Sequence, residues 1–580
     1  MLQKLRTRLA ASEALPQLSF LAVIIGAITG FVVLCLHLLV EWGQVQLLAT
    51  ADDFENLPPL FRVLLPVVGG LLVGLLIQSF RPENRAVGIV HVMERLVYHQ
   101  GYLPLRNAIL QFFGAAICLI SGHSVGREGP VVHLGGAAGS LLGQALKLPN
   151  NSLRNLIACG VSAAIAASFN TPLAAVIFTM EVVMVEYSVA SFTPVIISTV
   201  IATVITRHFT EIDATFRLSS DMLFLQPFPE LLYLVLVGIV IGLVATLFIT
   251  ILEQVTKHVA PRFEIWQRTT LAGLLTGIVS LWVPQIMGTG YDTVNATLMG
   301  DSVLSVLLII AIAKLLITPI CLGLGLPGGL IGPILLIGAM VGGAMGILIS
   351  DLLPYAETEH MLYAMFGMGA MMGAVLQAPL AALTALLEFT YNPGLILPSM
   401  VVIISAHLIT GTSPWRKHSV FIELMRARGL DYRADPISQS LRRIGVTHAM
   451  EQQFVILPHE TNEAEVIEAL QHNPLWIVTC DQKNQCHLLR ASDLAHYLQS
   501  SQTGEIGEII NLISIPAQRQ QIIPIYPQAT LQEAQEQLDK QNCEALYIVD
   551  IYKKYDDKQR FNIQGILTRH DIETHYRYGG

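Results

Sequence analysis

Charged side chains are scarce in this sequence. Of its 580 residues, only 13% are Asp, Glu, Lys or Arg, whereas 53% are hydrophobic. A soluble domain usually carries about 25% charged residues. The formal net charge of -9 gives no reason to expect nucleic acid as a partner, because nucleic-acid binding needs a basic surface. The composition therefore excludes an ordinary soluble protein and predicts a polytopic one embedded in a lipid bilayer.

Cysteine is also sparse, and its spacing is uninformative. No C-x-x-C pair occurs among the seven cysteines, which are Cys35, Cys118, Cys159, Cys321, Cys480, Cys486 and Cys543. The sequence therefore predicts neither a disulfide framework nor a zinc site. Nothing in it suggests a hydrolytic or redox centre, so we expect a protein that is not an enzyme, binds no metal and requires no cofactor.

Long windows without any charge fill the first 415 residues. They run over 17–40, 63–80, 107–126, 155–180, 187–206, 231–252, 269–291, 315–350, 361–387 and 389–415. Most have the roughly 20 residues needed to cross the bilayer core. The window 315–350 is too long for one helix and contains Pro319, Pro327 and Pro333, so we predict two interrupted half-spans there.

Basic residues flank these windows at both ends. Lys4, Arg6 and Arg8 precede the first window, and Arg416, Lys417, Arg426 and Arg428 follow the last. By the positive-inside tendency, both termini are expected in the cytoplasm. The first window is too long for a cleavable signal. The location predicted is therefore an integral membrane protein with several crossings, in the inner or plasma membrane if the protein is bacterial.

The membrane segment contains an internal repeat. Gly126-Arg127-Glu128-Gly129-Pro130 is matched 203 residues later by Gly329-Leu330-Ile331-Gly332-Pro333, and Gly135 and Gly139 are matched by Gly338 and Gly342. A second block, Pro172-Leu173-Ala174-Ala175, recurs at Pro379-Leu380-Ala381-Ala382. Repeated units with Gly/Pro-broken segments are typical of transporters that bind their substrate near mid-membrane. The alternative is that the glycines only allow helices to pack closely.

Each copy of the second block is followed by an acid, Glu181 or Glu388. Because the repeat supplies both symmetrically, we expect these two acids to brace helix ends inside the bundle rather than to carry ions.

The two glycine turns predict an anion site. A helix that starts at such a turn leaves main-chain N–H groups unpaired and directs the positive end of its dipole outward, which suits a small anion. Glu128 is an acid at membrane depth, where an acid is a functional candidate by default. Its carboxylate would compete with the anion when ionised and withdraw when protonated. The alternative is a structural ion pair between Glu128 and Arg127.

From about residue 434 the composition becomes that of a soluble domain. Two similar segments, 454–498 and 521–576, each predict a strand, a helix, two further strands and a closing helix. The sequence therefore divides into a membrane part, 1–433, with repeat halves at about 17–210 and 229–430, and an α/β tandem, 434–580.

At these motifs the sequence resembles the CLC family of chloride channels and chloride/proton exchangers. GREGP, GLIGP, the segment SFNTPLAAVIFTMEV and the α/β tandem appear in family order. The resemblance implies an all-α membrane domain with inverted repeats and broken helices, followed by a cytoplasmic pair of CBS domains. It also implies a homodimer, a gating role for Glu128, and anion contacts from the main chain of Arg127, Glu128, Gly129, Leu330 and Ile331.

The sequence departs from the family at three positions. Val87 stands where the family has an anion-contacting serine, and Phe421 stands where it has a tyrosine. Both changes remove a hydroxyl from the expected central site, which predicts weaker discrimination among monovalent anions. Val182 stands where exchangers often carry a second glutamate on the proton path.

These departures favour a passive channel for chloride or a similar anion, gated by Glu128 with protons as its ligand. The alternative is a chloride/proton exchanger. A third hypothesis, a divalent-cation channel, needs more acids than the apolar windows contain.

In CBS pairs an S/T-x-x-D pattern can bind adenine nucleotides. Thr568 and Asp571 carry the pattern, whereas the first unit has Arg490 in place of the hydroxyl and retains Asp493. The alternative is that Thr568 and Asp571 simply cap a helix.

Overall fold

A computed structural model describes residues 9, 15–48, 50–187, 189–209, 229–299, 303–352, 360–412, 417–430, 440–480, 485–501, 509–549 and 563–578. Two compact units form this part of the chain. The membrane unit comprises residues 18–145 and 153–433, and the α/β unit comprises 1–17, 146–152 and 434–580. Lys4, Arg6, Arg8 and Arg416 lie outside the described residues, so the cytoplasmic location of the termini stays a prediction.

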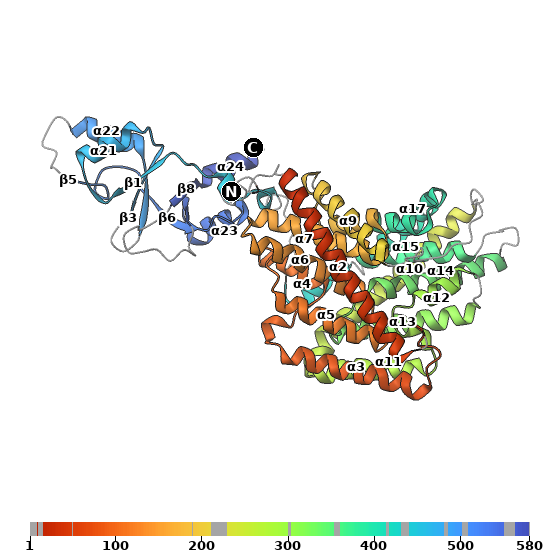
Figure 1. The fold of residues 1–580 in the computed structure, drawn as a ribbon. Helices are drawn as coiled ribbons and strands as arrows, with labels where there is room; N and C mark the ends of the chain where they lie inside the picture. The colour runs from red at the N-terminus through yellow and green to blue at the C-terminus, as the bar shows by residue number, and fades with distance from the viewer. Residues whose placement is uncertain are drawn as a thin grey trace. The chain divides into compact units, whose positions relative to one another are not determined.

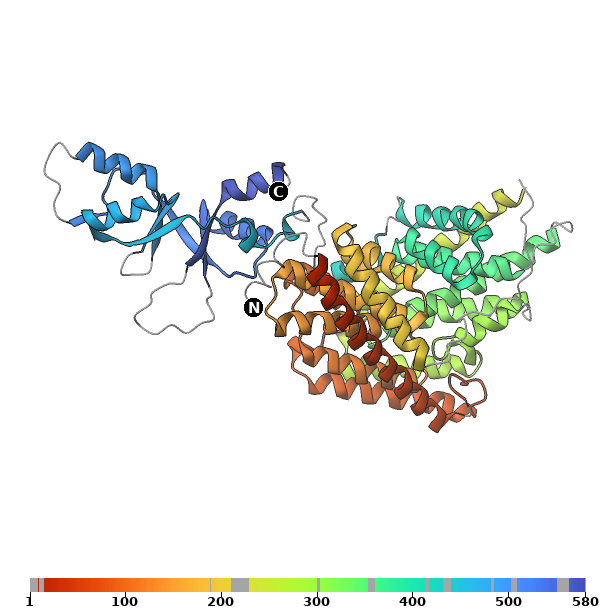
Figure 2. The same cartoon turned by 45° about the horizontal axis from the view of Figure 1, so that its top comes forward.

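The first half of the membrane unit is helical throughout (red to yellow in Figures 1 and 2). Its helices are α2 (Leu15–Leu47), α3 (Pro59–Ser79), η1 (Pro82–Asn84), α4 (Ile89–Tyr98), α5 (Leu105–Ile120), α6 (Glu128–Ala145), α7 (Asn150–Phe169), α8 (Pro172–Phe178), η2 (Thr179–Met184) and α9 (Val189–Phe209). The η2 segment is a π-helix that continues α8.

The second half of the membrane unit is also built of helices (yellow to blue-green in Figure 1). It contains α10 (Pro229–Gln254), η3 (Val255–Val259), η4 (Ala260–Arg262), α11 (Ile265–Ser280), η5 (Pro284–Ile286), α12 (Tyr291–Leu298), α13 (Leu304–Gly323), α14 (Ile331–Leu352), α15 (His360–Leu376), α16 (Pro379–Thr390), η6 (Pro393–Leu395), α17 (Ile396–Gly411) and α18 (Val420–Ala427).

Many of these helices are apolar enough to cross a membrane. Among the described residues, eight are both long and apolar enough, and several shorter apolar helices accompany them. The window 315–350 is broken as predicted, because α13 ends at Gly323 and α14 begins at Ile331. The prediction of half-spans is wrong, because both helices are long and apolar enough to cross a membrane. The polytopic, mostly helical membrane part expected from the sequence is therefore confirmed.

Glycines outside the two turns serve helix packing. A Cβ atom at Gly135 would overlap the carbonyl of Gly160 on α7, and one at Gly338 would overlap the carbonyl of Gly367 on α15. A Cβ atom at Gly139 would likewise overlap the carbonyl of Leu156 on α7, and one at Gly342 would overlap the carbonyl of Tyr363 on α15. For these four glycines the close-packing interpretation is the right one.

The two halves cap each other's helices. Glu181, in η2 of the first repeat, accepts hydrogen bonds from the main-chain N–H groups of Leu380 and Ala381 at the start of α16, at 3.3 and 2.7 Å. Glu388 accepts from Leu173 and Ala174 at the start of α8, at 2.8 and 2.7 Å. The expectation that both acids brace helix ends is confirmed, and each acid caps a helix of the opposite repeat.

The α/β unit contains α20 (Val446–Ala449), β1 (Phe454–Pro458), β2 (Glu460–Asn462), α21 (Glu463–Gln471), β3 (Trp476–Cys480), β4 (Cys486–Arg490), α22 (Ala491–Ser501), β5 (Ile509–Asn511), β6 (Gln520–Ile525), α23 (Leu531–Gln541), β7 (Ala545–Val549), β8 (Ile563–Thr568) and α24 (Arg569–Tyr578). One six-stranded sheet has the order β1-β3-β4-β6-β7-β8, and β2 pairs with β5.

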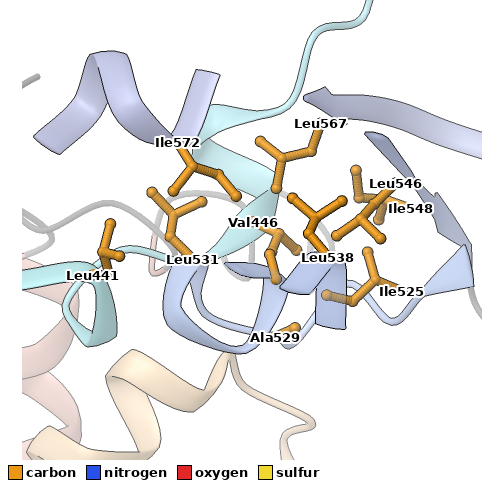
Figure 3. Packing of buried hydrophobic residues seen from close by; sticks show 11 residues of the cluster. Leu441, Val446, Ile525, Ala529, Leu531, Leu538, Leu546, Ile548, Leu567 and Ile572 are labelled. Atoms are coloured by element: carbon orange, nitrogen blue, oxygen red, sulfur yellow. The ribbon is translucent and has the colours of Figure 1, made fainter. Parts of the chain in front are cut away.

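Each half of this sheet has the predicted order of strand, helix, strand, strand and helix. In the first half, β1 pairs in parallel with β3, and β3 pairs antiparallel with β4. In the second half, β6 pairs in parallel with β7, and β7 pairs antiparallel with β8. The antiparallel pairing of β4 with β6 joins the halves. Figure 3 shows the core of the second half, where Val446, Leu531, Leu538, Leu546 and Ile572 pack together.

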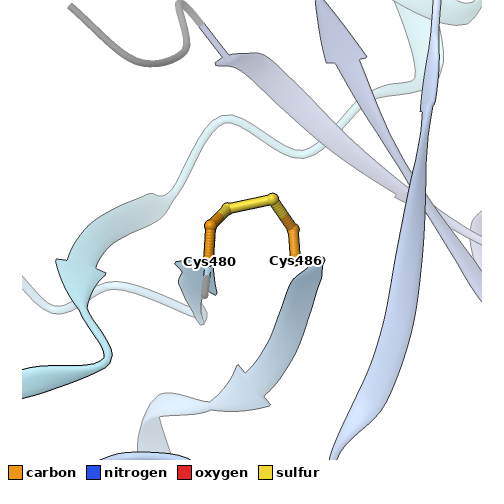
Figure 4. Close-up of a disulfide and its surroundings, with 2 residues drawn as sticks. All are labelled: Cys480 and Cys486. Carbon is orange, nitrogen blue, oxygen red and sulfur yellow. A yellow bond between two sulfur atoms is a disulfide. The ribbon is translucent and has the colours of Figure 1, made fainter. Parts of the chain in front are cut away.

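A disulfide joins Cys480 to Cys486, the facing ends of β3 and β4 (Figure 4). The cysteine spacing predicts no disulfide, and this prediction is wrong for Cys480 and Cys486. The two cysteines are six residues apart, and this spacing alone does not indicate a disulfide. They can bond because the β3–β4 hairpin makes them direct cross-strand neighbours.

We expect Glu388→Ala to lower the thermal stability of the membrane unit. The substitution leaves the amides of Leu173 and Ala174 without their acceptor, and loss of a helix cap costs about 0.5–2 kcal/mol. Melting of the purified full-length protein in detergent measures the effect. Glu83→Ala, which removes an exposed carboxylate from η1, is the control, and equal melting temperatures for the two variants would contradict the cross-capping role.

Candidate anion site between the two repeats

The two signature turns are hydrogen-bonded to each other. The N–H of Gly126 donates to the carbonyl of Gly329 at 2.7 Å, and the N–H of Gly329 donates to the carbonyl of Gly126 at 2.6 Å. This antiparallel bridge joins residues that are equivalent in the repeat. The turns therefore run in opposite directions, as a local two-fold relation between the repeats requires.

A helix starts two residues after each bridged glycine, α6 at Glu128 and α14 at Ile331. The first N–H groups of a helix have no partner within the helix, and they carry the positive end of its dipole. Two further helices start in the same region, α4 at Ile89 and α18 at Val420. Residues next to each of these starts line the cavity that is described in the next paragraph. Four helix starts thus favour negative charge at one place.

A cavity of about 390 Å³ lies at these helix starts. Four of the predicted site residues line it, namely Val87, Gly129, Leu330 and Phe421. Arg127, Glu128 and Ile331 are not among the lining residues. The lining at Val87 and Phe421 lacks the two hydroxyls that the family resemblance would have supplied.

Helix α5 holds the walls of this cavity in place. Asn107 donates to the carbonyl of Ala86 at 2.8 Å, and Gln111, one turn later, donates to the carbonyl of Pro327 at 2.9 Å. Both amides are buried. One helix of the first repeat therefore positions the segment before α4 and also the turn before α14.

Three arginines line the cavity, and the sequence analysis did not single them out for this role. Arg85, Arg268 and Arg428 are the charged residues among its lining residues. Arg85 is held by the main-chain carbonyls of Phe80 and Gln78, at 2.8 and 3.1 Å. Because these arginines come from distant segments, only their position beside apolar windows could have indicated them. Their charge attracts anions and repels cations.

Glu128 is fully buried and lies between the two turns. The hydroxyl of Tyr291 donates to its Oε1, whereas Oε2 has no donor among the described residues. A Cβ atom at Gly126 or at Gly329 would overlap or press on Oε2, so glycine is needed at both positions for the carboxylate to lie there. Since Gly329 also lines the cavity, the carboxylate lies directly behind the cavity wall.

Arg127 does not pair with Glu128. Its guanidinium donates to the carbonyl of Ser168 at 3.2 Å and lies over the ring of Tyr291, 5.1 Å from the ring centre. The alternative interpretation of these two residues as a structural ion pair is therefore wrong.

Val182 lies in the π-helix η2 and is buried. It lines a second cavity of about 230 Å³ together with Glu181, Lys417 and His418. The valine side chain at position 182 cannot titrate, but titratable side chains are among the residues that line the cavity beside it.

In the α/β unit, the S/T-x-x-D pattern forms a helix cap. The Asp571 carboxylate accepts from the N–H of Thr568 at 2.8 Å and from its hydroxyl at 2.7 Å, where α24 begins. The capping interpretation of this pair is confirmed. In the first half, the hydroxyl of Ser492 donates to Asp493 at 3.4 Å.

Two family models match the sequence. The model described as voltage gated chloride channel matches residues 69–411, which include both signature turns, and the CBS domain model matches residues 514–577. The second match covers the half of the sheet formed by β6, β7 and β8.

Individual relatives agree with the first match. A putative chloride channel protein ClcB-like from Ralstonia nicotianae is 32% identical over 64% of this chain and 88% of its own length. The H(+)/Cl(-) exchange transporter ClcA of Vibrio parahaemolyticus is 29% identical over 67% of this chain and 85% of its own length. The solved structure of a slow cyanobacterial Cl-/H+ antiporter has a TM-score of 0.64 and 26% identity, covering 71% of this chain and 98% of that one.

The fold, the paired glycine turns and the extent of these matches lead to one conclusion: the chain belongs to the CLC family of voltage gated chloride channels and related transporters, and it carries a C-terminal CBS domain.

Proposed function

We propose that this protein transports chloride across the membrane in exchange for protons, with Glu128 as the group that alternates with the anion. The observation that carries the proposal is the position of the Glu128 carboxylate. It lies among the glycines of both turns, behind a cavity lined by helix starts and arginines, and one of its oxygens has no donor among the described residues. An ionised group there is stable only where an anion is stable.

Proton coupling is the choice that the relatives favour. The sequence-based preference for a passive channel rested on Val87, Phe421 and Val182, and it has no support from the names of the Vibrio relative and the cyanobacterial structure, which are exchangers. The Ralstonia relative is named a putative channel. A passive channel therefore remains the second candidate, and Val182 is the observation in its favour.

The cavity beside Val182 supports proton movement without a carboxylate at that position. Glu181, Lys417 and His418 line it, and a space of about 230 Å³ holds several waters, since one water occupies about 30 Å³. Water between polar groups can carry a proton where no side chain does. A divalent-cation channel is disfavoured, because the charged residues that line the larger cavity are arginines.

The homodimer and the adenine-nucleotide site implied by the family resemblance also belong to this proposal. A nucleotide that binds Asp571 at the CBS unit would compete with Thr568, because the Asp571 carboxylate already accepts hydrogen bonds from the N–H and the hydroxyl of Thr568. Its effect on transport would come from different affinities for the two states of the membrane unit.

Reconstituted wild-type protein is expected to move protons uphill when a chloride gradient drives it, and Glu128→Gln is expected to abolish proton movement while chloride still passes. The reason is that the amide cannot release a proton. Chloride and proton fluxes from liposomes measure both quantities, with Glu83→Gln as the control. Chloride flux without any proton movement in the wild type would establish the passive channel instead.

A glutamate at position 182 is expected to raise the number of protons moved per chloride. It would add a titratable group to the wall of the second cavity. The measurement compares the flux ratio of Val182→Glu with that of Val185→Glu, since Val185 lines the same cavity. An unchanged ratio in Val182→Glu would show that the water path already suffices.

Restoring the missing hydroxyls is expected to tighten anion binding. In Val87→Ser and Phe421→Tyr, the new hydroxyl faces the larger cavity, and one hydrogen bond contributes about 0.5–1.5 kcal/mol. Calorimetric titration with chloride measures the change, and Val87→Ala, which adds no hydroxyl at the same position, is the control. Equal affinity in all variants would place the anion elsewhere.

A further inference from the structure

Glu128 has a side-chain partner that no sequence motif indicated. Tyr291, the first residue of α12, donates its hydroxyl to Oε1 of Glu128. Its ring packs edge-on against Phe169, with 6.2 Å between ring centres, and lies under the guanidinium of Arg127. A residue from the second repeat therefore contacts both charged residues of the first signature turn.

The backbone before Tyr291 is built to place this hydroxyl. Gly288 and Gly290 have φ angles of +60° and +82°, which glycine adopts without strain. The fully buried Lys314 of α13 donates to the carbonyls of Ile286 and Gly288 at 2.8 and 2.9 Å. A buried ammonium group needs such acceptors, so Lys314 and this loop fix each other's positions.

The loop has a second anchor. The hydroxyl of Thr289 donates to Asp52 at 3.4 Å, and Asp52 also accepts from Gln44 at 2.9 Å. The charged and titratable groups around the pair of Glu128 and Tyr291 are Arg127 on the same turn, Lys314 on α13, Asp292 on α12 and Asp52 in the loop between α2 and α3.

We propose that Tyr291, positioned by Lys314, is a latch that holds Glu128 in the closed position and limits how fast an anion replaces the carboxylate. The inference rests on the proposed role of Glu128. Before an anion can take the place of the carboxylate, the hydrogen bond from Tyr291 must break, and a hydrogen bond to a charged group is among the stronger ones in proteins.

Once Glu128 is protonated, the latch loses its hold, because a neutral acceptor binds a hydroxyl less strongly than an ionised one does. The latch therefore acts on the ionised carboxylate and weakens when the carboxylate gains a proton. A merely structural role for Tyr291 would not show this dependence on the protonation of Glu128.

The test is chloride efflux from liposomes that contain the purified full-length protein, measured as a function of pH. Tyr291→Phe is expected to raise the rate at neutral pH by about tenfold or more, as the loss of one hydrogen bond to a charged group predicts, and to match the wild type in acid. In a Glu128→Gln background, Tyr291→Phe is expected to change nothing. Tyr363→Phe, which removes a buried hydroxyl bonded to Glu230 at 3.2 Å, is the matched control and should keep the wild-type pH profile.

Lys314→Met tests the positioning role. It is expected to give the pH profile of Tyr291→Phe, and the double variant should not exceed either single one, since both changes remove the same interaction. A wild-type rate and pH profile in folded Tyr291→Phe protein, or an equal acceleration in the Glu128→Gln background, would overturn the latch. Proton movement by the wild type is measured separately, so failure of exchange and failure of the latch are distinguishable.

Discussion

The reciprocal hydrogen bonds between Gly126 and Gly329 are the interaction on which the rest of the membrane unit depends. They join the two repeats at the point where α6 and α14 begin, and they satisfy peptide groups that would otherwise be buried without partners at membrane depth. Only residues without a side chain allow this approach, because a Cβ atom at either position would press on the Glu128 carboxylate. The same two residues thus hold the repeats together and leave the space that Glu128 occupies.

Around this bridge, residues that the repeats share build the scaffold, and residues that differ between the repeats provide the function. Glu181 and Glu388 are equivalent, and each caps a helix of the opposite half. Glu128 has Ile331 as its counterpart, so only one of the two equivalent helix starts carries a carboxylate. A symmetric pair of acids there would repel each other and the anion. The asymmetry leaves one carboxylate at the paired helix starts, and it is this carboxylate that the proposed exchange couples to the anion.

The charges around the site are arranged in two layers. The first layer consists of main-chain N–H groups at the four helix starts, and the second consists of the three arginines among the residues that line the cavity. The first layer favours a small anion without binding it as tightly as a cationic side chain in direct contact would. The second raises the local concentration of anions. With Val87 and Phe421 in the lining, the cavity wall offers an anion no hydroxyl at these two positions.

The sequence alone determined the membrane unit, the break before α14, the two signature turns and the tandem α/β order, because hydrophobic periodicity, glycine and proline act over a few residues. It also identified Glu128 and the capping acids. Only the tertiary structure decided that Tyr291, 163 residues further along the chain, bonds to Glu128, that Arg85, Arg268 and Arg428 share one cavity, and that Cys480 faces Cys486. These contacts depend on how distant segments pack against one another, and no local pattern records that packing.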